Sequence, residues 1–395
     1  MKIAHVADAH WGYGYAGPTP EARFADITRT MDWVADRIIE EGCELVLFAG
    51  DAFKDARVYI DRATAEIQAF VDWLRRLSDA GIEVIVISGT PSHDAISAYH
   101  LIREMQIPGV EVVTEPQTAA LPSDGEVIVE CLPGMNRSSF ATDPRYAGLP
   151  PHEFHAKMTE DITDICSDMR EDSGGVPVIL MSHLSYELAD LGFEDALLQN
   201  EPILTDEAAR MFDLVCLGHI HRPQKAGSNV FYSGAPERHN FGDERTIPGF
   251  WIHETGVDEH LEFSGFKSSF IETPARRFRT IDWCDMDVAA WLDGQVDDFA
   301  HVRDAIVRVR YTCSEELQKR FDRRSLERAL YDAGAYFVAE IRAEVERSER
   351  IRDTEVTEGL TPLAALAAWA NNEGLAAAES AELLAITEEL MGVSR

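Results

Sequence analysis

Five apolar, strand-forming stretches of this chain each end on side chains that can bind a metal ion. They are KIAHVADAH, which ends on Asp8 and His10; LVLFAGD, on Asp51; IEVIVISGTPSHD, on His93 and Asp94; VPVILMSH, on His183; and DLVCLGHIH, on His219 and His221. In an open α/β sheet, ligands bind in the crevice outside the carboxyl ends of the strands. The pattern therefore predicts an α/β fold in which residues distant in sequence form one polar site.

The order of apolar patterns also predicts how the sheets are built. Residues 24–40 and 60–77 carry apolar residues at three- and four-residue spacing, and each stretch lies between two strand candidates. Strand-like runs over 111–134 and 229–266 suit a second sheet stacked on the first. We expect a two-sheet sandwich flanked by helices within residues 1–270.

The chain changes character after about residue 270. Strand candidates RRFRTIDW, AIVRVRYTC and YFVAEIRAEV enclose helical stretches near 286–300 and 314–333, which predicts a small α/β capping domain over 271–348. Residues 349–395 comprise a charged linker and, at 361–391, two short helices around an NNEG break, which predict a helical hairpin. Two interpretations of the hairpin stay open: it completes the cap, or it docks a partner.

The charge of the chain is strongly acidic. Its 70 acidic residues outweigh 36 basic ones, for a net charge of −34, and only six of the basic residues are lysine. Such a surface repels polyanions at low ionic strength, so charge alone argues against nucleic acid as a partner. Salt screens this repulsion, and the composition is compatible with either a salt-rich cytoplasm or an ordinary acidic protein.

Membrane and secretory signals are not evident in the 395 residues. The sequence has no signal-like N-terminus and no apolar run near eighteen residues, so we expect neither secretion nor a membrane span. The six cysteines lie far apart without CxxC spacing, which favours reduced thiols in a cytoplasmic protein.

The residues at the strand ends suit a particular chemistry. Side chains alternate along an extended segment, so Asp8 and His10 project to the same side, and Asp51 could bridge two cations with its two oxygens. A mixed aspartate and histidine set suits manganese, iron or zinc better than calcium or magnesium. Two such cations about 3.5–4 Å apart polarise a phosphate ester and lower the pKa of a bridging water. The natural reaction is hydrolysis of a phosphate ester.

The order of the motifs DAH, GD, a histidine-containing glycine turn, SH and GHIH resembles the calcineurin-like metallophosphoesterases. Within them the chain is similar to the SbcD and meiotic-recombination-eleven DNA double-strand-break repair nucleases, which have the loop SGSxER where this chain has SGAPER. The resemblance implies a DNA exonuclease and endonuclease that uses two divalent metal ions, foremost Mn²⁺. It also implies a homodimer that acts on duplex ends and single strands, and an SbcC-type coiled-coil ATPase that docks on the hairpin.

The resemblance also implies roles for individual residues. One metal would be held by Asp8, His10, Asp51 and His221, and the second by Asp51, His183 and His219. His93 would stabilise or protonate the reacting phosphate. Asp94 would orient that imidazole or simply cap the turn, and Arg222 and Arg238 would contact phosphate or be ordinary surface arginines.

One turn departs from the family pattern. The usual GNH turn, whose asparagine ligates the second metal, is replaced here by Gly89-Thr90-Pro91-Ser92-His93-Asp94. Ser92 directly precedes the histidine and is our predicted substitute ligand, although Thr90, a backbone carbonyl or water could fill the position. Because a hydroxyl is a weaker ligand than an amide oxygen, we expect the second metal to bind less tightly.

Three functions are compatible with these features. The first is a metal-dependent DNA nuclease that works with an ATPase partner. The second is a phosphodiesterase for small nucleotides, which would need neither cap nor hairpin. The third is a DNA-end-binding scaffold that has lost catalysis through the altered turn, against which the retained ligands argue.

Overall fold

A computed structural model of the chain describes residues 1–54, 56, 64–92, 94–170, 173–191, 200–257, 263–295, 299–346 and 360–391. Two six-stranded sheets form its centre. The first has the order β14 (Phe263–Glu272), β13 (Gly249–Val257), β1 (Lys2–Val6), β2 (Leu45–Ala49), β3 (Glu83–Ile87), β4 (Val110–Val113). The second has the order β11 (Gln224–Lys225), β12 (Val230–Tyr232), β10 (Leu214–Leu217), β7 (Val178–Ser182), β6 (Ile128–Leu132), β5 (Gln117–Thr118).

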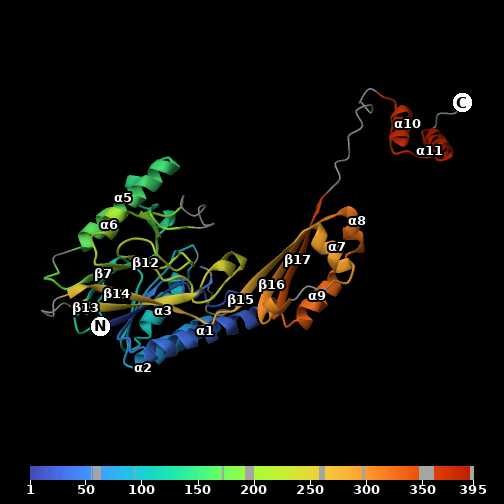
Figure 1. Cartoon of the computed structure of the whole chain (residues 1–395). Coiled ribbons are helices and arrows are strands. Elements are labelled where there is room, and N and C mark those ends of the chain that lie inside the picture. Colours follow the sequence, from blue (N-terminus) through green and yellow to red (C-terminus); the bar gives the residue numbers. More distant parts are fainter. Residues whose placement is uncertain are drawn as a thin grey trace. The chain divides into compact units, whose positions relative to one another are not determined.

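Helices cover the outer faces of both sheets (Figure 1). The first sheet packs its outer face on α1 (Pro20–Glu40), α2 (Thr64–Asp79) and α3 (Ile96–Glu104) through one apolar cluster. The second sheet packs on α5 (Pro151–Met169) and α6 (Asp206–Ala209) through another. A third apolar cluster lies between the two sheets. This α/β/β/α sandwich confirms the predicted fold class.

The sequence explains why α1 begins and packs where it does. The hydroxyl of Thr19 caps the helix by accepting the backbone N–H of Ala22 at 3.2 Å, and Pro20 stands at the first helical position. Ile27, Met31, Val34 and Ile38 follow at three- and four-residue spacing and are fully or almost fully buried.

Strand direction places the site. Strands β1, β2, β3 and β4 run parallel, as do β6, β7, β10 and β12, whereas β13 and β14 join the edge of the first sheet in antiparallel pairing. The expectation that the later strands all build the second sheet is therefore wrong for β4, β13 and β14. The carboxyl ends of the central parallel strands still share one edge.

A third sheet of three strands follows the sandwich in the chain. Its order is β15 (Arg277–Trp283), β16 (Ala305–Ser314), β17 (Phe337–Glu346), with α7 (Asp285–Leu292), α8 (Glu315–Arg320) and α9 (Arg323–Asp332) between the strands. The helix predicted over 314–333 is thus two helices. Phe321 separates them in an extended conformation, and its buried ring packs against Tyr311 in a tilted arrangement at a centroid distance of 4.5 Å.

The chain forms two compact units. The first comprises Met1–Ile281, Asp298–Val309 and Arg323–Ile341, and the second comprises Asp282–Asp297, Arg310–Asp322 and Arg342–Arg395. Part of the predicted cap therefore belongs to the same unit as the sandwich. In the second unit, α10 (Pro362–Asn372) contacts α11 (Ala377–Leu390), which confirms the helical hairpin. Within the described part of the chain, no helix is both long and apolar enough to cross a membrane.

The remaining elements that the structure describes are short. They are the two-stranded pair β8 (Ser185–Tyr186) and β9 (Ile203–Leu204), the helix α4 (Arg137–Phe140), and the single 3-10 turns Pro144–Tyr146, Phe241–Arg245 and Phe299–Val302. The six cysteines are all free thiols.

Candidate dinuclear metal centre

The predicted ligands outside the glycine turn come together at the carboxyl ends of four parallel strands. Asp8 and His10 follow β1, Asp51 follows β2, His183 follows β7, and His219 and His221 follow β10. The backbone joins neighbouring strand ends directly, because the Asp8 amide donates to the Gly50 carbonyl at 3.1 Å. These six side chains are buried except for His221, which is partly exposed.

The backbone at this edge has positive φ angles, which residues other than glycine rarely adopt. Asp8, His10, Asp51 and His219 have φ angles of 56°, 48°, 52° and 92°. Such left-handed residues cost about 1–3 kcal/mol each and cluster at functional sites. Four of the predicted ligands thus have an unfavourable backbone conformation. Because this conformation is retained despite its cost, the placement of their side chains points to a function.

One half of the site consists of Asp8, His10 and His221. One ligand atom from each lies within 4.8 Å of the others, and the Nε2 atoms of the two histidines are 3.1 Å apart. The outer nitrogen of each ring is held by the protein: His10 Nδ1 lies 3.2 Å from the Phe53 carbonyl, and His221 Nδ1 lies 3.6 Å from Asp243 Oδ1. Partners on the outer nitrogen are typical of metal-binding histidines because they fix the ring orientation.

The other half consists of Asp8, Asp51 and His183, which also present ligand atoms within 4.8 Å of one another. His183 Nδ1 donates to the Ala49 carbonyl at 2.7 Å, which leaves Nε2 facing the site. His183 Nε2 and Asp51 Oδ1 lie 3.4 Å apart, and neither atom has a hydrogen-bond partner. A Cβ atom at Gly89 would collide with Asp51 Oδ1, so this glycine leaves the carboxylate its space.

Asp51 faces both halves. Its Oδ2 lies 3.7 Å from His10 Nε2, whereas its Oδ1 lies 3.4 Å from His183 Nε2. One carboxylate therefore presents one oxygen to each group of ligands, which is the arrangement of a bridging ligand.

The charges in the site depend on one another. Burial would raise the pKa of Asp51, but the imidazoles of His183 and His10 hold it below its usual range. Burial would lower the pKa of His183, yet the Asp51 carboxylate raises it to about 10. For Asp8 burial dominates and raises the pKa to about 6, although neighbouring histidines oppose this. The carboxylates and imidazoles of the site therefore set one another's protonation states.

These residues fit divalent metal ions. The donors are carboxylate oxygens and imidazole nitrogens, a set that suits manganese, iron or zinc. His183 Nε2 and Asp51 Oδ1 are buried and have only their mutual ion pair, without a hydrogen bond, so a cation bound by both atoms would satisfy them.

His219 stands beside His183, with the two ring centroids 5.3 Å apart. Its backbone amide donates to both oxygens of Asp8 at 3.1 Å, and its Nε2 lies 3.1 Å from Glu201 Oε2. Nδ1 is therefore the nitrogen left to bind a metal. The buried Glu201 orients this ring as a carboxylate partner.

The glycine turn is organised by Asp94. Its carboxylate accepts the backbone N–H groups of Asp51 at 3.1 Å, Gly89 at 2.8 Å and Phe53 at 3.3 Å, as well as the hydroxyl of Tyr99. These contacts favour the turn-capping interpretation of Asp94. His93 lies outside the residues that the structure describes.

The two hydroxyls offered by the turn differ in burial. Ser92 is exposed, whereas Thr90 is only 1% exposed and its Oγ1 has no hydrogen-bond partner. Thr90 rather than Ser92 therefore offers a buried hydroxyl without a hydrogen-bond partner, which makes it the candidate for the position of the expected asparagine.

The two arginines predicted to contact phosphate lie in different surroundings. Arg222 pairs with Asp190 and lines a cavity of about 480 Å³ together with His221, Asp243 and Arg245. Arg238 instead donates to the Thr246 carbonyl at 2.9 Å and to the Arg276 carbonyl at 3.2 Å. Arg222 thus lines this cavity and Arg238 is not in its lining, whereas Arg245 is a second cation in the lining.

Sequence reasoning missed three residues of the site: Glu201, His239 and Asp243. His239 is buried and donates from Nε2 to the Asp8 carbonyl at 3.0 Å. Its ring packs edge-on against His10 at a centroid distance of 4.9 Å. None of the three lies in a predicted strand: Glu201 and His239 lie in loops, and Asp243 lies in the 3-10 turn Phe241–Arg245. Only the SGAPER motif, which directly precedes His239, marked one of these loops.

Comparisons with known proteins agree with this geometry. The family described as calcineurin-like phosphoesterase matches residues 1–223. A DNA double-strand break repair protein Mre11 from Aeropyrum pernix is 27% identical over 233 residues, which cover 56% of this chain and 49% of that protein. A protein of the same name from Archaeoglobus fulgidus is 31% identical over 110 residues, which cover 27% of this chain and 23% of that protein. The chain thus spans at most about half the length of these curated relatives.

Solved structures with partial similarity include two hydrolases. A dimetal phosphatase from Danio rerio has a TM-score of 0.38 and 11% identity, with 69% of this chain and 98% of that chain covered. A 5'-nucleotidase precursor from Thermus thermophilus has a TM-score of 0.33 and 13% identity, with 69% and 55% covered. The family match, which extends over more than half of the sequence, shows that this chain belongs to the calcineurin-like phosphoesterases.

Proposed function

We propose that the chain is a DNA phosphodiesterase that cleaves DNA ends as an exonuclease and endonuclease with two bound Mn²⁺ ions. The observation that carries the proposal is Asp51, whose Oδ2 faces His10 and whose Oδ1 faces His183. The substrate class rests on the two relatives named for DNA double-strand break repair.

Each group of residues has a proposed task. Asp8, His10, Asp51 and His221 hold one metal, and Asp51, His183 and His219 hold the second with Thr90. When bound, the metals supply Lewis-acid activation of the phosphate and of the attacking water. Glu201 and Asp243 orient His219 and His221, and Asp94 holds the turn that carries His93.

His93 is the proposed group for stabilising charge on the reacting phosphate or protonating the leaving oxygen. General acid catalysis contributes about 10²–10⁴-fold, so His93→Ala should lose at least about 10²-fold in cleavage of linear duplex DNA with Mn²⁺. His100→Ala, an exposed histidine on α3, is the matched control and should keep full activity.

A small chromogenic phosphodiester run in parallel separates the alternatives. Turnover of this ester without DNA cleavage would indicate a phosphodiesterase for small nucleotides. Bound metal without turnover of either substrate would indicate a scaffold.

A coiled-coil ATPase of the SbcC type is the proposed partner, with the hairpin of α10 and α11 as its docking element. Trp369 and Ile386 on these helices are 44% and 51% exposed. The full chain with both Trp369→Glu and Ile386→Glu should not bind the ATPase, and its cleavage of the small ester should be unchanged. Retained binding would assign the hairpin to another role.

A further inference from the structure

A second cluster of potential metal ligands lies between the two sheets. It consists of His5 on β1, Cys216 on β10 and His253 on β13, and one ligand atom from each lies within 4.8 Å of the others. All three residues are fully buried. The cluster shares no residue with the candidate dinuclear centre.

The pairing of the strands places these side chains in the layer between the sheets. His253 pairs with Ile3, and His5 pairs with Trp251, across the antiparallel strands β1 and β13. Directly paired residues point to the same face, and Ile3, Trp251 and Cys216 belong to the apolar cluster between the sheets. Two imidazoles therefore occupy an otherwise apolar layer, where an unsatisfied polar group is expensive.

The outer nitrogen of each imidazole has a partner. His5 Nε2 lies 3.1 Å from the Leu217 carbonyl, and His253 Nδ1 lies 2.8 Å from Ser268 Oγ. A carbonyl only accepts, so His5 carries its proton on Nε2 and presents the lone pair of Nδ1 inward. The Leu217 carbonyl and the Ser268 hydroxyl are thus partners on the outer nitrogens, as metal-binding histidines usually have.

The inner atoms have the spacing of metal ligands. His5 Nδ1 and His253 Nε2 are 3.5 Å apart. Two nitrogens about 2.0–2.1 Å from zinc at a tetrahedral angle are roughly 3.4 Å apart. Cys216 adds a sulfur ligand on the third side.

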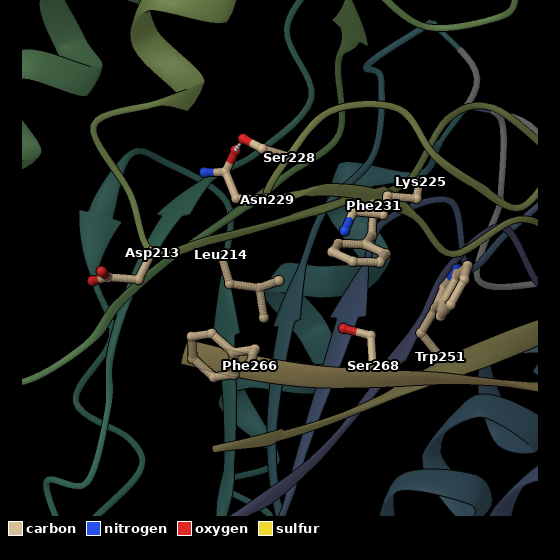
Figure 2. Close-up of a pocket in the computed structure, with 9 residues that line it drawn as sticks. All are labelled: Asp213, Leu214, Lys225, Ser228, Asn229, Phe231, Trp251, Phe266 and Ser268. Carbon is tan, nitrogen blue, oxygen red and sulfur yellow. Dashed lines mark hydrogen bonds between the residues drawn. The ribbon is translucent and has the colours of Figure 1, made fainter. Parts of the chain in front are cut away.

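A cavity lies next to the cluster. Its volume is about 260 Å³, and its lining includes Phe231, Trp251 and Ser268. Figure 2 shows these three residues on one side of the cavity, with Asp213 and Phe266 on the other. Ser268 contacts His253, and the ring of Phe231 packs edge-on against His253 at 5.0 Å, so these side chains form the wall between the cavity and the cluster.

We propose that His5, Cys216 and His253 bind one soft d10 cation, Zn²⁺ or Cu⁺, that pins the two sheets together. Thiolate and imidazole ligands without carboxylate select such ions over manganese or magnesium. On binding, the Cys216 thiol gives its proton to solvent and a metal–sulfur bond forms, with no change of oxidation state. His5 lies three residues before Asp8, and Cys216 lies three residues before His219. The bound cation would therefore stabilise the two strands that place Asp8 and His219.

The test uses the full chain after chelation and reduction. Co²⁺ serves as the optical probe for the zinc site, because only a thiolate ligand gives the near-ultraviolet sulfur-to-cobalt charge-transfer band. Cu⁺ is titrated separately against a chromogenic chelator. We expect the wild type to bind either one Co²⁺ ion with this band or one Cu⁺ ion. The protein loaded with Zn²⁺ or with Cu⁺ should then unfold at a higher temperature than the apoprotein.

Cys216→Ala should lose the band and weaken binding of this ion by at least about tenfold. Cys131→Ala is the matched control, because Cys131 is equally buried in the same apolar cluster, and it should behave like the wild type. A wild type that shows neither band nor Cu⁺ binding would overturn the proposal even if Cys216→Ala fails to fold. Equal binding by both variants would also overturn it and leave a hydrogen-bonded histidine pair.

Discussion

Individual side chains at the strand ends are held in place before any cation binds. His183 Nδ1 is fixed by the Ala49 carbonyl, His219 by Glu201, and His221 by Asp243. Because each ring is oriented from its outer side, little reorganisation is needed for its inner nitrogen to bind a metal. The left-handed backbone of Asp8 and Asp51 belongs to the same preorganisation.

The turn hydroxyls give a first prediction at this scale. Thr90→Val removes the buried hydroxyl while keeping the shape of the side chain, so the second Mn²⁺ should bind about tenfold more weakly, equivalent to about 1.4 kcal/mol. Ser92→Ala should bind both ions like the wild type, because Ser92 is exposed. Calorimetric titration measures both constants; the reverse pattern would assign the ligand to Ser92.

Asp94 gives a second prediction. Its removal leaves the buried amides of Asp51 and Gly89 without an acceptor, and unpaired buried groups cost about 1–3 kcal/mol each. Asp94→Ala should therefore lower the free energy of unfolding by about 3 kcal/mol or more in urea titrations. Tyr99→Phe removes one bond to the same carboxylate and the bond that the Tyr99 oxygen accepts from the buried Ala52 amide, and should cost about 1–3 kcal/mol. Equal effects of the two variants would contradict this account.

The predictability of the site follows from where its residues lie. Asp8, Asp51 and His183 end parallel strands, and strands place their ends at one edge, so the sequence pattern alone predicts their convergence. Glu201 reaches the site from a loop and Asp243 from the 3-10 turn Phe241–Arg245, and the placement of both depends on tertiary packing.

At the scale of elements, α1 and the strands that follow residue 270 are joined by a buried ion-pair network. Arg276 donates to Asp26 Oδ2 through Nε at 2.9 Å and to Asp26 Oδ1 through Nη2 at 2.7 Å. It also donates to Asp304 Oδ1 at 2.6 Å, and its guanidinium stacks 3.7 Å above the ring of Tyr336. Its side chain is only 8% exposed.

Arg276 gives a third prediction. Removing one partner of a buried ion pair costs about 3–5 kcal/mol, so Arg276→Ala should lower the free energy of unfolding by that amount. Arg276→Lys should recover only part of it, because lysine lacks the planar fork that binds both oxygens of Asp26. Arg277→Ala, an exposed neighbour, should change stability by less than about 1 kcal/mol. A full rescue by lysine would mean that only the charge matters.

The same network predicts a pH dependence. Burial would raise the pKa of Asp26, but its bonds to Arg276 and Arg29 hold it below the ordinary value. A carboxylate with a lowered pKa stabilises the fold above its unfolded pKa of about 3.9, and this contribution disappears as the pH falls through the folded pKa. Asp26→Asn should therefore be less stable than the wild type by a constant amount above about pH 5, and the difference should shrink in more acidic buffer. A difference that grows with acid would contradict the assignment.

The elements themselves were predicted where local pattern decides them. The alternating helices and parallel strands follow from apolar periodicity, as in α1, whose spacing and proline cap are local signals. The division of 314–333 into α8 and α9 was missed, because it depends on the ring of Phe321 packing against Tyr311, a tertiary contact. The pairing of β13 with β1 is equally non-local.

For the whole molecule, the net charge of −34 should govern the response to salt. Self-repulsion among like charges destabilises the compact state. Salt weakens this repulsion, because the Debye length falls from about 10 Å at 0.1 M to about 3 Å at 1 M salt. The unfolding temperature should therefore rise between 0.05 and 1 M KCl, as measured by calorimetry. KCl is preferred to sulfate, which stabilises proteins by surface exclusion. A flat or falling curve would contradict dominant self-repulsion.

The central claim is that Asp51 bridges two metal ions, and electron paramagnetic resonance of the Mn²⁺-loaded protein tests it most directly. Two Mn²⁺ ions that share a carboxylate about 3.5–4 Å apart are spin-coupled and give a different spectrum from isolated ions. The wild type should bind two ions and show the coupled spectrum, and Asp51→Asn should show only uncoupled Mn²⁺ with at most one ion tightly bound. Two uncoupled ions in the wild type, or a coupled pair retained in Asp51→Asn, would contradict the bridging role of Asp51.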